Sequence, residues 1–231
     1  MAFRLVQPSV LPGFRISLGF SLAYLAVIVL LPLAALLSST LSIDGAEIWR
    51  IATEDRTLAA LKVSFLTALA AAAFDLPLGL LVAWVLVRYD FPGRRLLDAM
   101  IDLPFALPTA VAGIALTALY APNGWIGALL APLGVKIAFT PVGIFIALVF
   151  VSLPFIVRTV QPVLADADRE VEEASASLGA GRLFTVLRVV LPPLLPTLLT
   201  GFALALARAI GEYGSVIFIA GNIPYVSEIA P

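Results

Sequence analysis

The chain has 231 residues, of which 61% are hydrophobic and 13% are charged, and its formal net charge at pH 7 is −1. A soluble domain carries about 25% charged residues, so this composition excludes a water-soluble globule and predicts a polytopic membrane protein. The chain contains no cysteine and no histidine, which excludes disulfides, thiolate metal sites and catalysis by Ser-His or Cys-His pairs.

Five apolar runs along the chain are long enough to cross a bilayer. A hydrocarbon core of about 30 Å requires roughly 20 helical residues. The runs cover residues 16–37, 58–87, 103–120, 142–160 and 191–216. We therefore predict an all-α fold, a polytopic transmembrane helical bundle, with residues 1–231 forming a single transmembrane domain.

The distribution of basic residues predicts the orientation of these spans. Cytoplasmic loops carry an excess of Lys and Arg, so the side with more of them is expected to be cytoplasmic, and it includes the N-terminus. The chain is then expected to leave the fifth span on the outer side, and we expect a sixth span beyond Pro231. Nine basic residues lie on the first side (Arg4, Arg15, Arg88, Arg94, Arg95, Arg158, Arg169, Arg182 and Arg188) and three on the other (Arg50, Arg56 and Lys136).

The longest polar segment on the predicted cytoplasmic side covers residues 161–188. Leu164, Val171 and Leu178 recur there at helical spacing, which predicts one or two short amphipathic helices at the membrane face. Gly179 and Gly181 are expected to interrupt them. An ordinary interfacial helix is the alternative to a functional segment.

Within this segment and just after it, several residues follow a spacing known from transporters. Glu173-Ala174-Ser175, Gly179 and Leu191-Pro192 resemble the EAA motif of ABC importer permeases, E-A-A-x3-G-x9-I-x-L-P. Ser175 replaces an Ala and Val189 replaces an Ile of that pattern. The resemblance implies a rigid coupling helix that docks on an ATPase, formed by Glu172, Glu173, Ala174, Ser175, Gly179, Leu191 and Pro192.

The resemblance extends beyond this motif. Residues 91–116, 154–164 and 208–225 are similar to the CysT-type sulfate/thiosulfate permease, a sister of the molybdate permease. This implies a MetI-like permease of a bacterial inner membrane, with a CysW-type permease partner, two CysA-type ATPase subunits and a periplasmic sulfate- or thiosulfate-binding protein. It also implies a subunit that is not itself an enzyme.

The energy source is expected to lie outside this chain. Its two lysines, Lys62 and Lys136, are not part of a G-x-x-x-x-G-K-[ST] sequence, so the chain has no P-loop for ATP. No cofactor is expected to bind to this chain, and ATP and Mg are expected to bind to the partner ATPase.

Several polar residues lie inside the predicted spans, where they are costly and often functional. Asp75 is expected to be paired, protonated or in contact with water, with structural pairing favoured. Arg208 and Glu212 are four residues apart and can form an intrahelical pair; the alternative is a contribution to an anion pathway. Lys62 is expected to snorkel to the interface, and Asp102 to mark the start of the third span.

A pathway for a hydrated dianion is expected to offer hydroxyls and backbone N–H donors rather than one deep cationic site. Prolines within a span free backbone groups, which is tolerated where a cavity is lined, and glycines allow close helix packing. The candidate pathway residues are Pro104, Pro108, Thr109, Ser152, Arg208, Glu212, Gly214 and Ser215.

Three other functions remain open at this point. The first is a molybdate or tungstate permease of the same family. The second is a gradient-driven secondary transporter, which needs coupling carboxylates at mid-depth and usually an internal repeat; only Asp75 fits, and no repeat is visible. The third is an intramembrane enzyme, for which no pair of Asp residues lies at matching depth in two spans.

Overall fold

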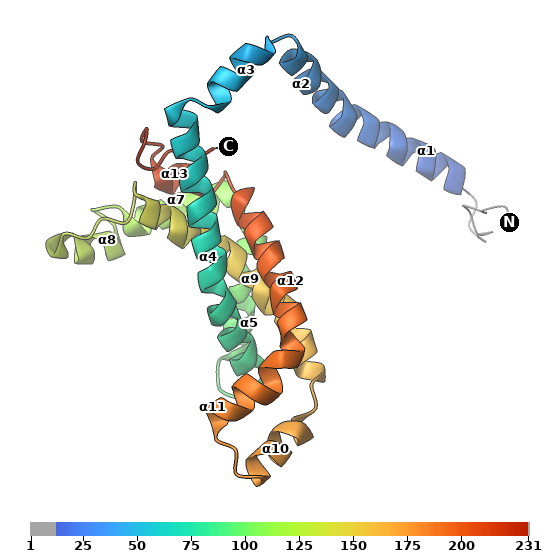
Figure 1. Ribbon diagram of the computed structural model, residues 1–231, viewed down its shortest axis with the longest axis vertical. Coiled ribbons are helices and arrows are strands. Elements are labelled where there is room, and N and C mark those ends of the chain that lie inside the picture. The colour runs from blue at the N-terminus through green and yellow to red at the C-terminus, as the bar shows by residue number, and fades with distance from the viewer. Residues whose placement is uncertain (1–12, 231) are drawn as a thin grey trace. The chain divides into compact units, whose positions relative to one another are not determined.

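The computed structural model describes residues 13–230, apart from the side chain of Arg15, and every secondary-structure element among them is helical. Arg4, which enters the orientation argument, and Pro231, beyond which a sixth span is expected, lie outside the described residues. The chain divides into two compact units, Met1–Glu54 and Asp55–Pro231 (Figure 1). Each unit is considered by itself.

The first unit consists of one long apolar helix and one short amphipathic helix. Helix α1 (Phe14–Leu25), the π-helical turn η1 (Ala26–Leu30) and α2 (Leu31–Leu41) follow one another without a break. This candidate span, Ile16–Leu41, extends past the expected end at residue 37. Helix α3 (Gly45–Ala52) follows, and its N-cap Asp44 accepts a hydrogen bond from the backbone N–H of Ala46 at 3.4 Å.

Three long helices form the core of the second unit. Helices α4 (Asp55–Arg88), α9 (Pro141–Asp166) and α12 (Leu191–Ile210) pack side by side (Figure 1). Small residues allow this approach: a Cβ added to Gly79 of α4 would lie 2.7 Å from Cγ2 of Ile156 on α9. Close backbone contact of this kind is what holds helices together in lipid, where burial of apolar surface contributes little.

The third span, predicted over residues 103–120 with interruptions at Pro104 and Pro108, has different bounds in the structure. Helices α5 (Arg94–Ile101) and α6 (Leu103–Ala106) precede a break at Leu107 and Pro108, and α7 (Thr109–Tyr120) begins after it. Leu107 is extended, with φ −90° and ψ 136°, because a residue before proline avoids the helical region. The candidate span is Thr109–Leu133, which includes α8 (Trp125–Leu130) and the 3-10 turn η2 (Ala131–Leu133).

The fifth span also differs from the prediction, at both of its ends. It begins with α11 (Arg182–Phe184) and the π-helical segment η3 (Thr185–Val190), so Leu191 and Pro192 lie within it instead of starting it. Proline has no N–H to donate, and it therefore fits where the hydrogen-bond pattern changes. The helix ends at Ile210, not at residue 216, and a non-helical turn leads to α13 (Val216–Ala220).

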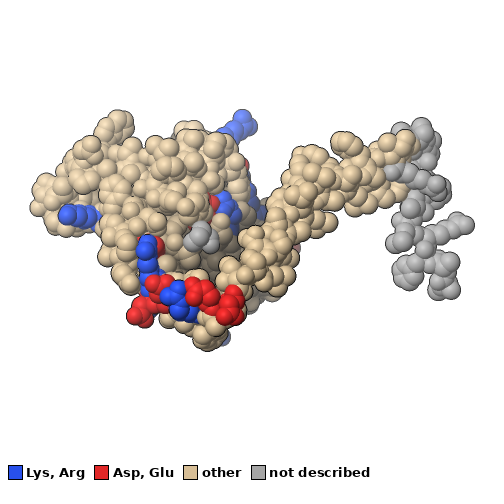
Figure 2. All heavy atoms as spheres, turned by 90° about the horizontal axis from the view of Figure 1, so that it is seen from above, with Lys and Arg blue, Asp and Glu red and all other residues tan. Residues whose placement is uncertain are grey.

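Among the described residues, five helical segments are long and apolar enough to cross a membrane, as predicted: Ile16–Leu41, Asp55–Arg88, Thr109–Leu133, Pro141–Asp166 and Arg182–Ile210. The surface has the matching character, because the atoms seen in Figure 2 belong overwhelmingly to uncharged residues, with charged side chains in small groups. The fold is an all-α bundle of transmembrane helices.

Candidate functional site

The predicted coupling segment contains a well-defined helix, α10 (Arg169–Ser177), at one end of the second unit (Figure 1). The predicted segment begins too early, because residues 161–166 still belong to α9. The carboxylate of Asp168 caps α10 by accepting from the N–H of Glu170 at 2.9 Å, and acidic residues in the first turn complement the helix dipole. A nine-residue helix therefore begins directly after the end of α9.

Gly179 forms the turn that ends α10, as predicted. Its φ is +84°, a conformation that L side chains rarely adopt, and a Cβ there would meet nothing within 4 Å. Only the backbone conformation requires glycine at this position. Gly181 differs, because it has an ordinary φ of −70° as the N-cap of α11.

Part of the motif forms one surface. Ala174, Ser175 and Gly179 line an open hollow of about 700 Å³ together with Leu178 and Phe184. Leu178 is 89% exposed. A hydrogen bond of 2.9 Å joins the hydroxyls of Ser175 and Thr185, and thus fixes α10 to η3. By contrast, Leu191 lines a separate apolar hollow beside Trp84, and Pro192 lines neither.

Glu172 faces the second unit itself. Its Oε1 accepts from Nη2 of Arg88 at 2.6 Å, and the same Nη2 lies 3.3 Å from the backbone oxygen of Ala167. The Arg88 side chain is only 7% exposed and its guanidinium lies 5.8 Å from the Trp84 ring centroid. Glu173, the next residue, is exposed. Glu172 and Glu173 therefore have different surroundings.

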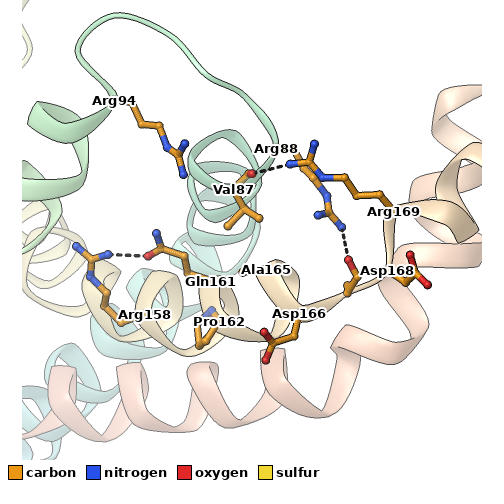
Figure 3. A pocket seen from close by; sticks show the side chains of 11 residues that line it. Val87, Arg88, Arg94, Arg158, Gln161, Pro162, Ala165, Asp166, Asp168 and Arg169 are labelled. Atoms are coloured by element: carbon orange, nitrogen blue, oxygen red, sulfur yellow. Dashed lines mark hydrogen bonds between the residues drawn. The ribbon is translucent and has the colours of Figure 1, made fainter.

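A second arginine network lies beside a cavity of about 980 Å³ that Arg88 also lines (Figure 3). Arg158 of α9 donates from Nε and Nη2 to the two carboxylate oxygens of Asp102, at 2.8 and 2.7 Å. Its Nη1 lies 2.6 Å from Oδ1 of Asp98 on α5 and also donates to Gln161. Asp102 is thus half of a bidentate ion pair and does more than mark the start of a span.

Sequence reasoning missed both arginine networks. The only sequence signal was indirect, since the four-residue spacing of Asp98 and Asp102 puts both carboxylates on one side of a helical turn. Their partner is 56 and 60 residues further along the chain, and the spacing gives no indication of it.

Most of the predicted pathway residues meet where α7 begins and α12 ends. Nη1 of Arg208 lies 2.5 Å from Oε2 of Glu212, and Oε1 of Glu212 accepts from both the N–H and the Oγ of Ser215 at 2.7 and 2.8 Å. A Cβ added to Gly214 would overlap Oγ1 of Thr109 and lie 3.0 Å from its Cβ. Thr109, Arg208, Glu212, Gly214 and Ser215 thus form one contiguous group.

The remaining candidates lie elsewhere. Ser152 is fully buried on α9; its Oγ lies 2.6 Å from Oδ2 of Asp75 on α4 and 2.6 Å from the backbone oxygen of Leu148. Asp75 is therefore paired and fully buried, although its Oδ1 has no hydrogen-bond partner among the described residues. Pro104 occupies the first turn of α6, where proline is tolerated, and the break comes at Pro108.

Two comparisons of sequence agree on the kind of protein. Residues 75–229 match the family described as binding-protein-dependent transport system inner membrane component. The chain is 53% identical over 213 residues to a probable sulfate transport system permease protein cysT from Nephroselmis olivacea, covering 92% of this chain and 75% of that protein. It is 49% identical over 227 residues to the sulfate transport system permease protein CysT of Escherichia coli, covering 98% and 82%.

Solved structures show the same fold at low sequence identity. A bacterial alginate ABC transporter, solved in complex with an alginate pentasaccharide-bound periplasmic protein, contains a chain that matches with a TM-score of 0.71 and 16% identity. The match covers 93% of this chain and 77% of that one. A second crystal structure, of an ABC transporter that imports the polysaccharide alginate, matches with a TM-score of 0.69 and 14% identity over 89% and 76% of the two chains.

Proposed function

This chain belongs to the family of inner membrane components of binding-protein-dependent transport systems, and on that premise we propose that it is the permease subunit of an ATP-driven importer of sulfate or thiosulfate. The observation that carries this proposal is the identity of 49–53% to CysT proteins over more than nine tenths of the chain. The chain is a multi-pass inner membrane component, and its role is transport.

The ATP-hydrolysing step belongs to partner subunits in this proposal. The chain has no P-loop, so two CysA-type ATPase subunits bind ATP and Mg and transmit their closure to the permease. Helix α10 is the segment best suited to receive the movement of the ATPase subunits, because its C-terminal end exposes Leu178 next to the small residues Ala174 and Ser175. Exposed Glu173 adds a charge at the same surface.

A second permease and a binding protein complete the proposed complex. A CysW-type permease partner forms the pathway together with this chain, and a periplasmic sulfate- or thiosulfate-binding protein delivers the anion. The alginate transporter, which was solved with a periplasmic protein, supports this arrangement. In the proposed orientation the N-terminus and α10 are cytoplasmic, which agrees with the excess of Arg in the segments assigned to the cytoplasmic side.

The pathway is proposed to pass the junction of α7 and α12. Both helices are interrupted there, at Pro108 and after Ile210, and interrupted backbone at membrane depth is tolerated where it lines a cavity or is buried in protein. Thr109 is the candidate anion donor, because its half-buried side chain carries a hydroxyl and lies at this junction, against Gly214. The hydroxyls of Ser152 and Ser215 already have partners within the chain.

The experiment that tests the proposal measures ATP hydrolysis by the reconstituted complex. Sulfate-loaded binding protein is expected to stimulate hydrolysis and to support uptake of labelled sulfate into proteoliposomes. A molybdate-loaded binding protein is the control, and it is expected to have no effect. Stimulation by the molybdate-loaded protein alone would instead assign the chain to the molybdate and tungstate permeases, the second candidate function.

A further inference from the structure

We propose that Arg88 is a positioning residue that locks the coupling helix α10 to the end of α4, with Glu172 as its partner inside the permease. The proposal rests on the proposed function of α10 as the segment that receives movement of the ATPase. It changes the role of Glu172 from a contact with the ATPase to an internal anchor, and it adds a residue that the EAA-like pattern does not include.

Two contacts run in opposite directions between α4 and the start of α10. Arg88, the last residue of α4, donates to Glu172 of α10 at 2.6 Å and to the backbone of Ala167 at 3.3 Å. In return, Arg169 of α10 donates to the backbone oxygen of Val87 at 3.2 Å. Figure 3 shows the Arg88 and Arg169 side chains side by side between the end of α4 and the start of α10. Each helix thus supplies an arginine to the other.

Burial distinguishes this ion pair from the surface pairs of the chain. The side chains of Arg88 and Glu172 are 7% and 23% exposed, whereas those of Arg94 and Asp90 are 42% and 94% exposed. An exposed pair contributes little to stability, while removal of one partner of a buried pair leaves a charge that water cannot reach. The Arg88–Glu172 pair therefore holds a defined geometry, and Arg94–Asp90 provides a matched control.

The arginines around the cavity already have partners. Arg88 contacts Glu172, Arg94 contacts Asp90 and Arg158 contacts Asp98 and Asp102, while Arg169 donates to the backbone. These partners leave little positive charge free to bind an anion. Several of these contacts link one helix to another, and those of Arg88 and Arg169 connect α4 to α10.

The ion pair of Arg88 and Glu172, called the tether below, has a mechanical consequence. Helix α4 packs along both α9 and α12, so a displacement of α10 that is passed to Arg88 reaches the core of the bundle directly. Without the Arg88–Glu172 pair, α10 is joined to the rest of the unit by the chain segments at its two ends and by two hydrogen bonds, from Arg169 to the backbone of Val87 and between Ser175 and Thr185. The predicted defect is therefore loss of coupling while the ATPase remains bound.

The first test uses the permease alone and does not depend on its substrate. The chain contains no cysteine, so a spin label can be attached at Ser177→Cys, an exposed position at the end of α10. Arg88→Gln and Glu172→Gln are each expected to increase the mobility of the label, and Arg94→Gln is not. In the exchanged variant Arg88→Glu/Glu172→Arg, the mobility of the label is expected to return to the value in the parent protein. Unchanged label mobility in Arg88→Gln would overturn the proposal.

The second test uses the assembled transporter. In Arg88→Gln the ATPase is expected to co-purify and hydrolyse ATP as in the parent complex, while sulfate uptake per ATP hydrolysed falls about tenfold. Arg94→Gln is expected to leave that ratio unchanged. Loss of ATPase co-purification from Arg88→Gln would place Arg88 at the ATPase contact and contradict the tether. A parent complex that moves no sulfate would contradict the proposed function, and the label measurement would still decide the tether.

Discussion

Glu212 and Arg208 form an ion pair in which only one partner is deeply buried. Their closest atoms are 2.5 Å apart, and the side chain of Glu212 is 2% exposed while that of Arg208 is 31% exposed. Because Oε1 of Glu212 also accepts two hydrogen bonds from Ser215, the carboxylate holds the turn between α12 and α13. The pair therefore has a structural role, in addition to any contribution to the pathway.

This asymmetry predicts that Arg208→Ala destabilises the permease more than Glu212→Gln. Removing Arg208 leaves a buried carboxylate unpaired, which costs about 3 kcal/mol, whereas the amide oxygen that Glu212→Gln introduces still accepts from Ser215. The double variant Arg208→Ala/Glu212→Gln is expected to recover the assembly lost in Arg208→Ala. Yield of monodisperse permease in detergent measures assembly. Recovery of assembly without recovery of transport would assign Arg208 to the pathway, and full stability of Arg208→Ala would contradict the structural role.

The close approach of Gly214 to Thr109 predicts a rescue. Gly214→Ala places a methyl group against Oγ1 of Thr109 and 3.0 Å from its Cβ, so it is expected to lower thermal stability and to abolish uptake. Adding Thr109→Ala removes the nearer atom and is expected to restore part of the stability. Gly19→Ala is the control, because a Cβ there has nothing within 4 Å. A stable and active Gly214→Ala variant would contradict the tight junction of α7 with this turn.

The contact between Asp75 and Ser152 predicts that Asp75→Asn is tolerated. Oγ of Ser152 has one proton and lies 2.6 Å from two oxygens, on Asp75 and Leu148, so a neutral donor at position 75 satisfies both contacts. The Asn amide supplies such a donor, whereas Asp75→Leu leaves Ser152 with one partner and alters the packing of α4 on α9. We expect near-normal thermal stability for Asp75→Asn and a loss of about 1–3 kcal/mol for Asp75→Leu. Equal losses in both variants would refute this reading.

Two glycines at the end of α10 allow the effect of backbone conformation to be tested apart from the effect of steric crowding. Neither Gly179 nor Gly181 has an atom within 4 Å of an added Cβ, but only Gly179 has a positive φ. Gly179→Val is therefore expected to cost about 1–2 kcal/mol locally and to reduce both uptake and ATPase co-purification, while Gly181→Ala does neither. Normal uptake and co-purification in Gly179→Val would refute the proposal that the ATPase docks on a rigid surface at this turn.

The negative charge of Glu173 at the same surface can be tested by a second pair of variants. Glu173→Lys is expected to weaken co-purification of the ATPase more than Glu170→Lys. Both residues are exposed, and Glu170 lies almost one turn earlier, in the first turn of α10. An equal loss in the two variants would indicate a general effect of charge and would count against a specific contact at Glu173.

The predicted orientation can be tested by labelling of introduced cysteines. Ser42 and Ser177 are both exposed, and the chain has no other cysteine to react. A membrane-impermeant thiol reagent applied to intact cells is expected to label Ser42→Cys and not Ser177→Cys. Both variants are expected to react after the cells are opened. The opposite pattern in intact cells would reverse the orientation.

The sequence allowed the membrane class, the number of visible spans and the turn at Gly179 to be predicted. Length and apolarity decide whether a segment can cross a bilayer, and a glycine at a fixed spacing after a helical stretch marks a turn. These properties belong to segments of consecutive residues, so no knowledge of their neighbours in space was needed. The EAA-like spacing also located α10 within a few residues.

Only the tertiary structure decided which side chains meet. The partners of Arg88 and Arg158 lie 84 and 56 residues away, and nothing in the local pattern of either segment specifies them. The break before Pro108 and the turn after Ile210 have local causes, the proline and the hydrogen bond between Glu212 and Ser215, and the tertiary structure adds the contact of Thr109 with Gly214. Local composition sets which segments become helices in the membrane. The direction in which Glu172 points follows from its ion pair with Arg88, on a helix that is distant in the chain.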